Sequence, residues 1–160
     1  MKILIWPGHH DAMDALIKAF THGRGSHAAF LREDNRTIHE AFMPELRDRI
    51  VMPHDRRVAE VYELEGVSDH QHKQFERLFD YNLRRRIKYS IVDLFRYAIN
   101  RPCRDEHHTF CSRYVLFCLH AILEDQQMPL VRLPDRDWAS PQDLRISPRL
   151  HLIKHYLRYT

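Results

Sequence analysis

The order in which strand and helix patterns follow one another most constrains the fold of this chain. The apolar run Lys2–Trp6 is typical of a short buried strand, and further strands are expected at Ser26–Glu33, Arg36–Phe42 and Val58–Glu65. Helices are expected at Asp11–Phe20, Asp69–Arg86, Ser90–Ile99 and Thr109–Leu123. Because strands dominate the first part and helices the later part, the sequence predicts an α+β fold.

The size and charge of the chain indicate an ordinary globular protein. Its 160 residues suit one domain spanning 1–160, and 44% of them are apolar. The net charge is only +3, so no nucleic-acid partner is expected, and the basic run Arg84–Lys88 is interpreted as a solvated helix face. No window reaches the roughly 18 apolar residues of a membrane span. The apolar run Ile3–Trp6 is too short for a signal-peptide core, so a cytoplasmic location is expected.

One of the three cysteines lies where a thiol becomes reactive. An odd, sparse set (Cys103, Cys111 and Cys118) suits reduced thiols better than disulfides. Thr109 is a suitable N-cap, which places Cys111 in the first turn of a helix. Free N–H groups and the helix dipole favour a thiolate there, and they could also bind an oxyanion. Cys118 lies deeper in the same apolar helix and is expected to be an inert core thiol.

A histidine supplies the second part that a thiol nucleophile needs. His27 opens a strand that otherwise consists of small and apolar residues. A helix-start cysteine and a strand-start histidine together form a candidate nucleophile and base. Either residue alone is more simply interpreted as structural.

The hairpin after His27 offers two candidates to orient its imidazole. If Asp34-Asn35 forms a two-residue turn, Ala29 lies opposite Glu40. Ala29 shares a strand face with His27, so Glu40 would lie on the His27 face and His39 on the other. A turn longer by one residue would exchange them, because a one-residue slip swaps the faces. Glu40 is therefore the preferred third member, with His39 as the alternative.

Three short motifs resemble a known family. Ser26-His27, then Glu40-Ala41, then Phe110-Cys111-Ser112 resemble the circularly permuted branch of the NlpC-like papain-fold superfamily. That branch includes bacterial permuted papain-like amidases and, more distantly, lecithin retinol acyltransferase. In it the histidine precedes the cysteine, the reverse of papain. The resemblance spans about residues 1–153 and implies a small antiparallel sheet packed against helices, among them a central helix headed by the cysteine.

The resemblance also implies a reaction. Cys111 would attack an amide, peptide or ester carbonyl, His27 would move the proton, and Glu40 would hold His27 while an acyl-enzyme forms. Tyr89 and Ser112 are the implied substrate-binding residues. The substrate would be a small-molecule, peptide or lipid-like compound with an acyl linkage, either hydrolysed or transferred, and neither a cofactor nor a metal is implied. Arg113 stands where the family often has glutamate, which bears on substrate preference.

Two readings from other classes remain. The first is a catalytically silent binding module on the same fold. The second is a zinc-stabilised interaction protein that uses Cys103, His107, His108 and Cys111 as ligands. Their spacing is not a common zinc-finger pattern, and adjacent histidines rarely both bind one ion.

Overall fold

One curled, mixed sheet organises the part of the chain that the computed structural model describes, which is residues 1–7, 15, 25–51, 59–99, 101, 107–123, 140–147 and 149–154. Within these residues the sheet has eight strands in the order β7-β6-β4-β3-β2-β1-β5-β8. The strands are β1 (Lys2–Trp6), β2 (His27–Leu31), β3 (Thr37–Phe42), β4 (Glu45–Ile50), β5 (Glu60–Leu64), β6 (Lys88–Tyr89), β7 (His108–Thr109) and β8 (Leu150–Lys154). The helices are α2 (Asp69–Arg84), α3 (Ile91–Ala98), α4 (Cys111–Ile122) and α5 (Pro141–Arg145).

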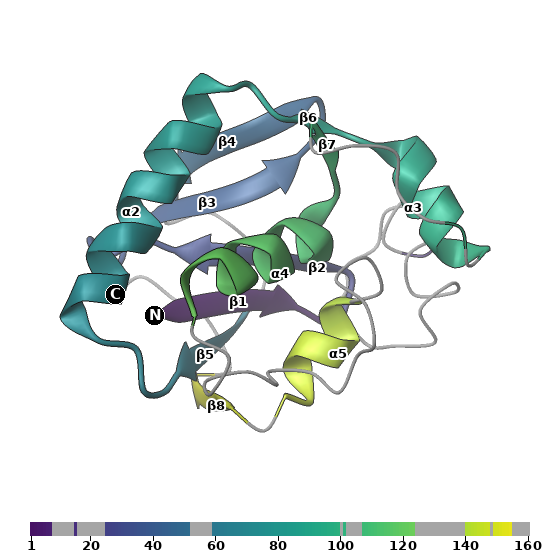
Figure 1. Cartoon of the computed structure of the whole chain (residues 1–160). Helices are drawn as coiled ribbons and strands as arrows, with labels where there is room; N and C mark the ends of the chain where they lie inside the picture. Colours follow the sequence, from purple (N-terminus) through teal and green to yellow (C-terminus); the bar gives the residue numbers. More distant parts are fainter. Residues whose placement is uncertain are drawn as a thin grey trace.

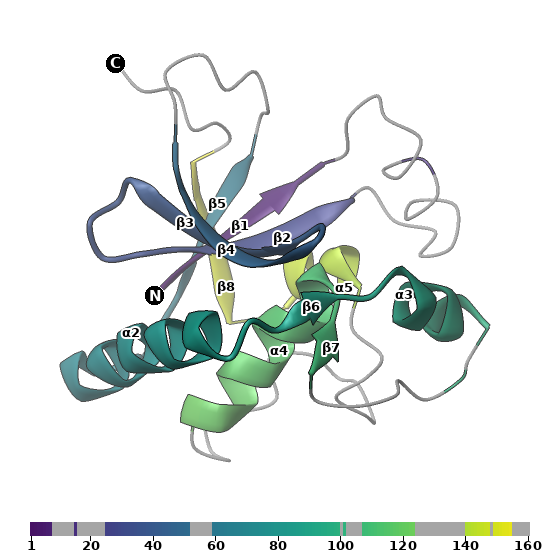
Figure 2. The same ribbon diagram turned by 90° about the horizontal axis from the view of Figure 1, so that it is seen from above.

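The helices α2 and α4 cover one face of the sheet, as two perpendicular views show (Figures 1 and 2). Alternate strand residues such as Ile3, Ile5 and Phe30 pack on that face against Phe79 of α2 and Val115 of α4. The intervening residues form a second cluster on the opposite face, which contains Leu4, Trp6, Ala29, Leu31, Ile38, Val51, Ala59 and Val61. Burial on both faces explains why β1 and β2 have almost no polar positions.

The predicted mixed α+β class is confirmed, and so are most of the predicted elements. The strands β1, β2, β3 and β5 and the helices α2, α3 and α4 lie within the expected ranges. The strand β4 was not predicted from the sequence. The expected helix Asp11–Phe20 falls almost wholly outside the described residues. No helix in the described ranges is long and apolar enough to cross a bilayer.

The β2–β3 hairpin has the predicted register but not the predicted turn. Phe30 pairs with His39 and Leu31 with Ile38, the pairing expected for a two-residue turn. The loop is longer, however, because its last closing bond runs from the Arg32 N–H to the Thr37 carbonyl (2.9 Å). The Asp34 carboxylate accepts from the backbone of residues 36 and 37 and stabilises this four-residue loop. Because the loop is longer by two residues, an even number, the alternation of side chains along β3 is unchanged and each side chain keeps its predicted face.

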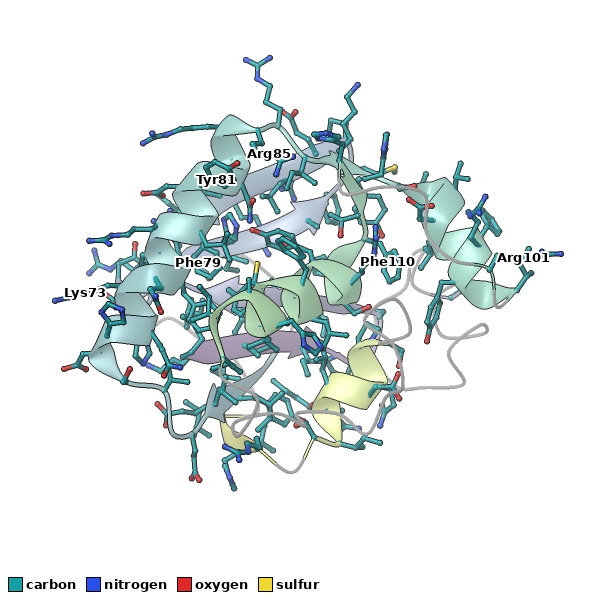
Figure 3. The ribbon with its side chains drawn as sticks, viewed as in Figure 1. Lys73, Phe79, Tyr81, Arg85, Arg101 and Phe110 are labelled. Atoms are coloured by element: carbon teal, nitrogen blue, oxygen red, sulfur yellow. The ribbon has the colours of Figure 1, made fainter. Side chains whose placement is uncertain are left out.

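The predicted cap at Thr109 is wrong. Phe110 is the N-cap of α4, and no side chain caps the helix there. Thr109 belongs instead to β7, which pairs in parallel with β6, and its carbonyl accepts from the Ser90 N–H (2.7 Å). Because the sheet uses Thr109, the helix begins later and Cys111 is its first residue. Figure 3 places Phe110 at this junction.

Candidate active site

Cys111 sits at the positive end of α4 and is almost fully buried, with 1% of its surface exposed. Burial on its own raises the pKa of a thiol. The positive charge of His27 and a hydrogen bond between the two side chains outweigh burial, and so do bonds from the backbone of Ala28 and Ser112. The result is a Cys111 pKa below the ordinary value, which favours a thiolate.

A divergence of two strands makes the Ala28 contact available. The ladder between β1 and β2 runs over five residue pairs, down to Trp6 opposite His27. The ladder between β2 and β3 ends after Phe30–His39 and Leu31–Ile38. On the β3 side, the Ala28 N–H therefore donates to the sulfur of Cys111 rather than to a strand. The start of α4 thus contacts β2 beyond the end of its ladder with β3.

His27 connects the thiol to a carboxylate. Its Nε2–H donates to Glu40 Oε2 (3.0 Å), which leaves Nδ1 for the sulfur. The side chain is 12% exposed. Burial lowers the pKa of His27, but the charge and hydrogen bond of Cys111, followed by those of Glu40, raise it to about 9. The imidazole lies between the rings of Trp6 (5.0 Å between centroids) and Phe42 (5.8 Å), which restrict its rotation.

Glu40 is fully buried yet ionised. Its Oε1 accepts from Arg47 through Nε (3.0 Å) and Nη2 (2.8 Å) and from Arg49 through Nε (2.9 Å). Burial raises the pKa of the carboxyl, but His27, Arg49 and Arg47 together lower it to about 2. The hydrogen bonds of this carboxylate to Arg47, Arg49 and His27 are therefore charge-assisted.

His39, the alternative third member, lies on the other face of β3. Its Nδ1–H donates to Asp48 (2.6 Å), and its Nε2 is hydrogen-bonded to the hydroxyl of Tyr114 (2.7 Å). The His39 ring stacks on Phe79 at 4.3 Å. The face prediction that favoured Glu40 over His39 is thus confirmed by the contacts.

Ser112 follows Cys111 in α4 and Tyr89 pairs with Thr109 nearby, and their substrate-binding roles stay predictions. The strand β6 brings Tyr89 alongside Thr109, two residues before the cysteine. Tyr89 is half-buried and packs against Leu94 and Phe110. Ser112 is 1% exposed, and its backbone N–H helps to lower the pKa of the Cys111 thiol.

Sequence reasoning missed Arg47 and Arg49. They alternate along β4, so both reach the same face of the sheet. In the register of β3 with β4, Arg47 is directly opposite Glu40, and Arg49 is the diagonal neighbour opposite Ile38. The alternation could have revealed them if β4 had been recognised.

The candidate zinc ligands lie only in part within the described residues. Cys103 lies outside the described residues, as do its neighbours up to residue 106. Cys111 is hydrogen-bonded to His27, and His107 approaches Arg85 at 3.4 Å. Among the described residues, no group of three or more His, Cys, Asp or Glu side chains is arranged to hold a metal ion. In the basic run, Arg84, Arg86 and Lys88 are exposed while Ile87 is buried.

Comparison with solved structures identifies a neighbour in fold. The crystal structure of the metalloprotein yiiX from Escherichia coli O157:H7 (DUF1105) superposes with a TM-score of 0.70. The match covers 96% of this chain and 95% of that protein, at 15% sequence identity. No protein-family model matches the sequence, and no curated protein does so either. The likeness therefore concerns the fold alone.

Proposed function

We propose that the protein is a cysteine-dependent hydrolase or acyltransferase acting on an amide, peptide or ester carbonyl. The observation that carries this proposal is the continuous chain of hydrogen bonds from Cys111 through His27 to Glu40 at the start of a buried helix. A lowered thiol pKa next to a raised imidazole pKa is the condition for a thiolate–imidazolium pair.

The proposed mechanism uses these three side chains in fixed roles. The Cys111 thiolate attacks the carbonyl carbon, and the developing oxyanion lies near the N-terminus of α4, where backbone N–H groups point outward. Imidazolium His27 gives its proton to the leaving amine or alkoxide as the acyl-enzyme forms. Neutral His27 then removes a proton from water or from an acceptor alcohol or amine, which attacks the acyl-enzyme and regenerates Cys111. Glu40 keeps the His27 ring oriented and stabilises its charged form.

The fold and the order of these residues support membership in the circularly permuted NlpC-like branch as part of the same proposal. A helix headed by the cysteine packs on strands that carry the histidine and the carboxylate, and the histidine comes first in the chain. The description of the neighbouring structure as a metalloprotein suggests one control. Reactions are run with and without a chelator, and a cysteine mechanism predicts equal rates.

The two buried cysteines provide a matched test of the nucleophile. Cys111 and Cys118 are 1% and 0% exposed, but burial raises the pKa of Cys118 to about 12. At mildly acidic pH, iodoacetamide should alkylate Cys111 far faster than Cys118, as peptide mass spectrometry can measure. Equal labelling of both thiols would contradict the proposal.

Trapping of an acyl-enzyme tests the reaction itself. Incubation with activated esters and thioesters of short and long acyl chains should add the acyl mass to Cys111 in wild-type protein and in Cys118→Ala. Cys111→Ala should fold and remain unmodified. Selective alkylation of Cys111 without any acyl adduct across this panel would favour the silent binding module.

A further inference from the structure

Arg47 and Arg49 form a clamp on one oxygen of Glu40. Three N–H groups from the two guanidinium groups converge on Oε1 at 2.8–3.0 Å, while Oε2 accepts from His27. The two carboxylate oxygens therefore differ in role, since the arginines hold Oε1 in place while Oε2 faces the imidazole of His27. An anchored Oε1 stops the carboxylate from rotating about its last bond.

Each arginine also packs on one of the two rings that enclose the imidazole. The guanidinium carbon of Arg47 lies 4.2 Å from the centroid of Phe42, and that of Arg49 lies 6.0 Å from the centroid of Trp6. Both distances are within the range of cation–π attraction. His27 is thus bounded by two ring–arginine pairs, and both arginines bind the same carboxylate.

The clamp exceeds what is needed to neutralise a buried carboxylate. When the site is charged, imidazolium His27 already supplies one counter-charge to Glu40, and the arginines add two more. The side chains of Arg47 and Arg49 keep 39% and 21% of their surface exposed, so the clamp extends from solvent to the fully buried Glu40. The charged or titratable groups around Glu40 in the described residues are His27 on β2 and these two arginines on β4, with Cys111 on α4 beyond His27.

We propose that Arg47 and Arg49 are positioning residues of the candidate active site, which hold the Glu40 carboxylate charged and aimed at His27 and so maintain the reactive Cys111–His27 pair. This inference rests on the proposed function. It adds that the working unit contains five side chains. Without the clamp, a neutral and rotating Glu40 would release the imidazole, and Cys111 would lose its partner.

The first measurement follows the Glu40 carboxyl directly. Its ¹³C resonance, assigned with Glu40→Gln, should titrate near the acid limit in wild-type protein. In Arg47→Gln and Arg49→Gln, the midpoint should move up by about 1–3 pH units, the usual effect of a neighbouring arginine on a carboxyl. Unchanged midpoints in both variants would overturn the proposal.

Conservative variants separate charge from geometry. Arg49 donates one N–H to Oε1, which a lysine ammonium can replace, so Arg49→Lys should retain most of the wild-type midpoint. Arg47 donates two N–H groups in a fork, which lysine does not reproduce. Arg47→Lys should therefore recover less than Arg49→Lys, and equal recovery would argue against a geometric role for Arg47.

The second measurement links the clamp to the reactive pair. In Arg47→Gln/Arg49→Gln, the rate of Cys111 alkylation should fall at pH values below the raised Glu40 midpoint, where Glu40 is neutral, and recover as the pH rises above it. Arg32→Gln is the matched control, since Arg32 binds Asp48, which in turn binds His39 on the other face. This control should leave the Cys111 profile unchanged. Should the double variant fail to fold, each single variant is measured in the same way.

The outcomes of these measurements distinguish the two proposals. If wild-type Cys111 is not selectively alkylated, the proposed function fails, whatever Glu40 does. If Cys111 is selectively alkylated but neither the Glu40 midpoint nor the alkylation profile responds to the arginine variants, only the clamp fails. If the Glu40 midpoint moves while the Cys111 profile does not, the arginines are structural partners of Glu40, and the positioning role is overturned.

Discussion

Two networks, each built from a histidine, a carboxylate and arginine, lie on opposite faces of β3 and β4. On one face, His27 binds Glu40, which binds Arg47 and Arg49. On the other face, His39 binds Asp48, which binds Arg32. Each histidine also meets a side chain of α4, which is Cys111 in the first network and Tyr114, one turn later, in the second.

What differs is the group at the end of each network. Cys111 is the first residue of its helix, where the N–H groups of Ala28 and Ser112 stabilise a thiolate. Tyr114 lies within the helix, and burial together with Cys118 raises the pKa of its phenol well above the ordinary value. Its hydroxyl also accepts from Asn82 (3.1 Å), a residue of α2. The same histidine–carboxylate–arginine arrangement thus ends at a thiol of lowered pKa at the helix start and at a phenol of raised pKa inside the helix.

Truncation of His39 should have the largest effect on stability. His39→Ala removes the stacking on Phe79 and leaves the buried hydroxyl of Tyr114 without its ring partner. We expect a loss of about 3 kcal/mol in the free energy of unfolding, measured by urea denaturation. The alkylation rate of Cys111 in the folded protein should stay at the wild-type level, and a large decrease would mean that the two networks are coupled.

Truncation of His27 should have the next largest effect, on reactivity. Without the imidazolium, the Cys111 pKa returns to the ordinary thiol range or above, because burial then dominates. At about pH 6.5 the alkylation rate should fall about 100-fold, because only about 1 in 100 molecules of an unperturbed thiol is ionised at that pH. An unchanged rate would remove the main support for the pair.

Glu40→Gln should cost about 2 kcal/mol, since the variant leaves two arginines facing a neutral group. The cost should depend on pH. The Glu40 pKa is lowered to about 2, so its stabilising contribution is complete above the unfolded value of 4.5 and is lost as the pH falls towards 2. The His27 pKa is raised to about 9, so its contribution is complete below 6.5 and is lost as the pH rises through 9. The stability difference between wild type and variant should therefore be largest between pH 4.5 and pH 6.5. A difference that does not vary with pH would contradict this prediction.

Cys118→Ala should have the smallest effect. Cys118 is fully buried and its pKa is raised to about 12, so it acts as a small core residue. We expect a loss of about 1 kcal/mol in stability and unchanged labelling of Cys111. A slower reaction at Cys111 would show that the helix interior contributes to the site.

The sequence predicted the three central residues because each prediction depended on a local rule. Helix-start position indicated Cys111, strand-start position indicated His27, and the alternation of side chains across a hairpin indicated Glu40. The hairpin prediction survived an error in the turn because the real loop is longer by an even number of residues. The helix start was misplaced because Thr109 is used by β7, and pairing with a strand some twenty residues away is not visible in local sequence.

The partners Arg47, Arg49 and Asp48 were not predicted because they lie on β4, a strand that was not expected from the sequence. Glu45–Ile50 has acidic and basic residues at most positions, and this composition resembles a solvated loop more than a strand. The charged side chains of β4 are stable in the sheet because Arg47 binds Glu40 on one face and Asp48 binds His39 on the other. The strand is therefore specified by residues of its neighbour, which a scan of the segment alone does not include.

The divergence of β2 from β3 makes one backbone amide an indicator of the chemistry at the sulfur. The Ala28 N–H is held by Cys111 instead of by a carbonyl of the sheet. Its exchange with deuterated solvent should therefore be slow while the sulfur is a thiolate, and should accelerate when Cys111 is protonated or alkylated. Amides on the paired side of β2 would keep their protection, so a single NMR resonance would report the state of the site without any substrate.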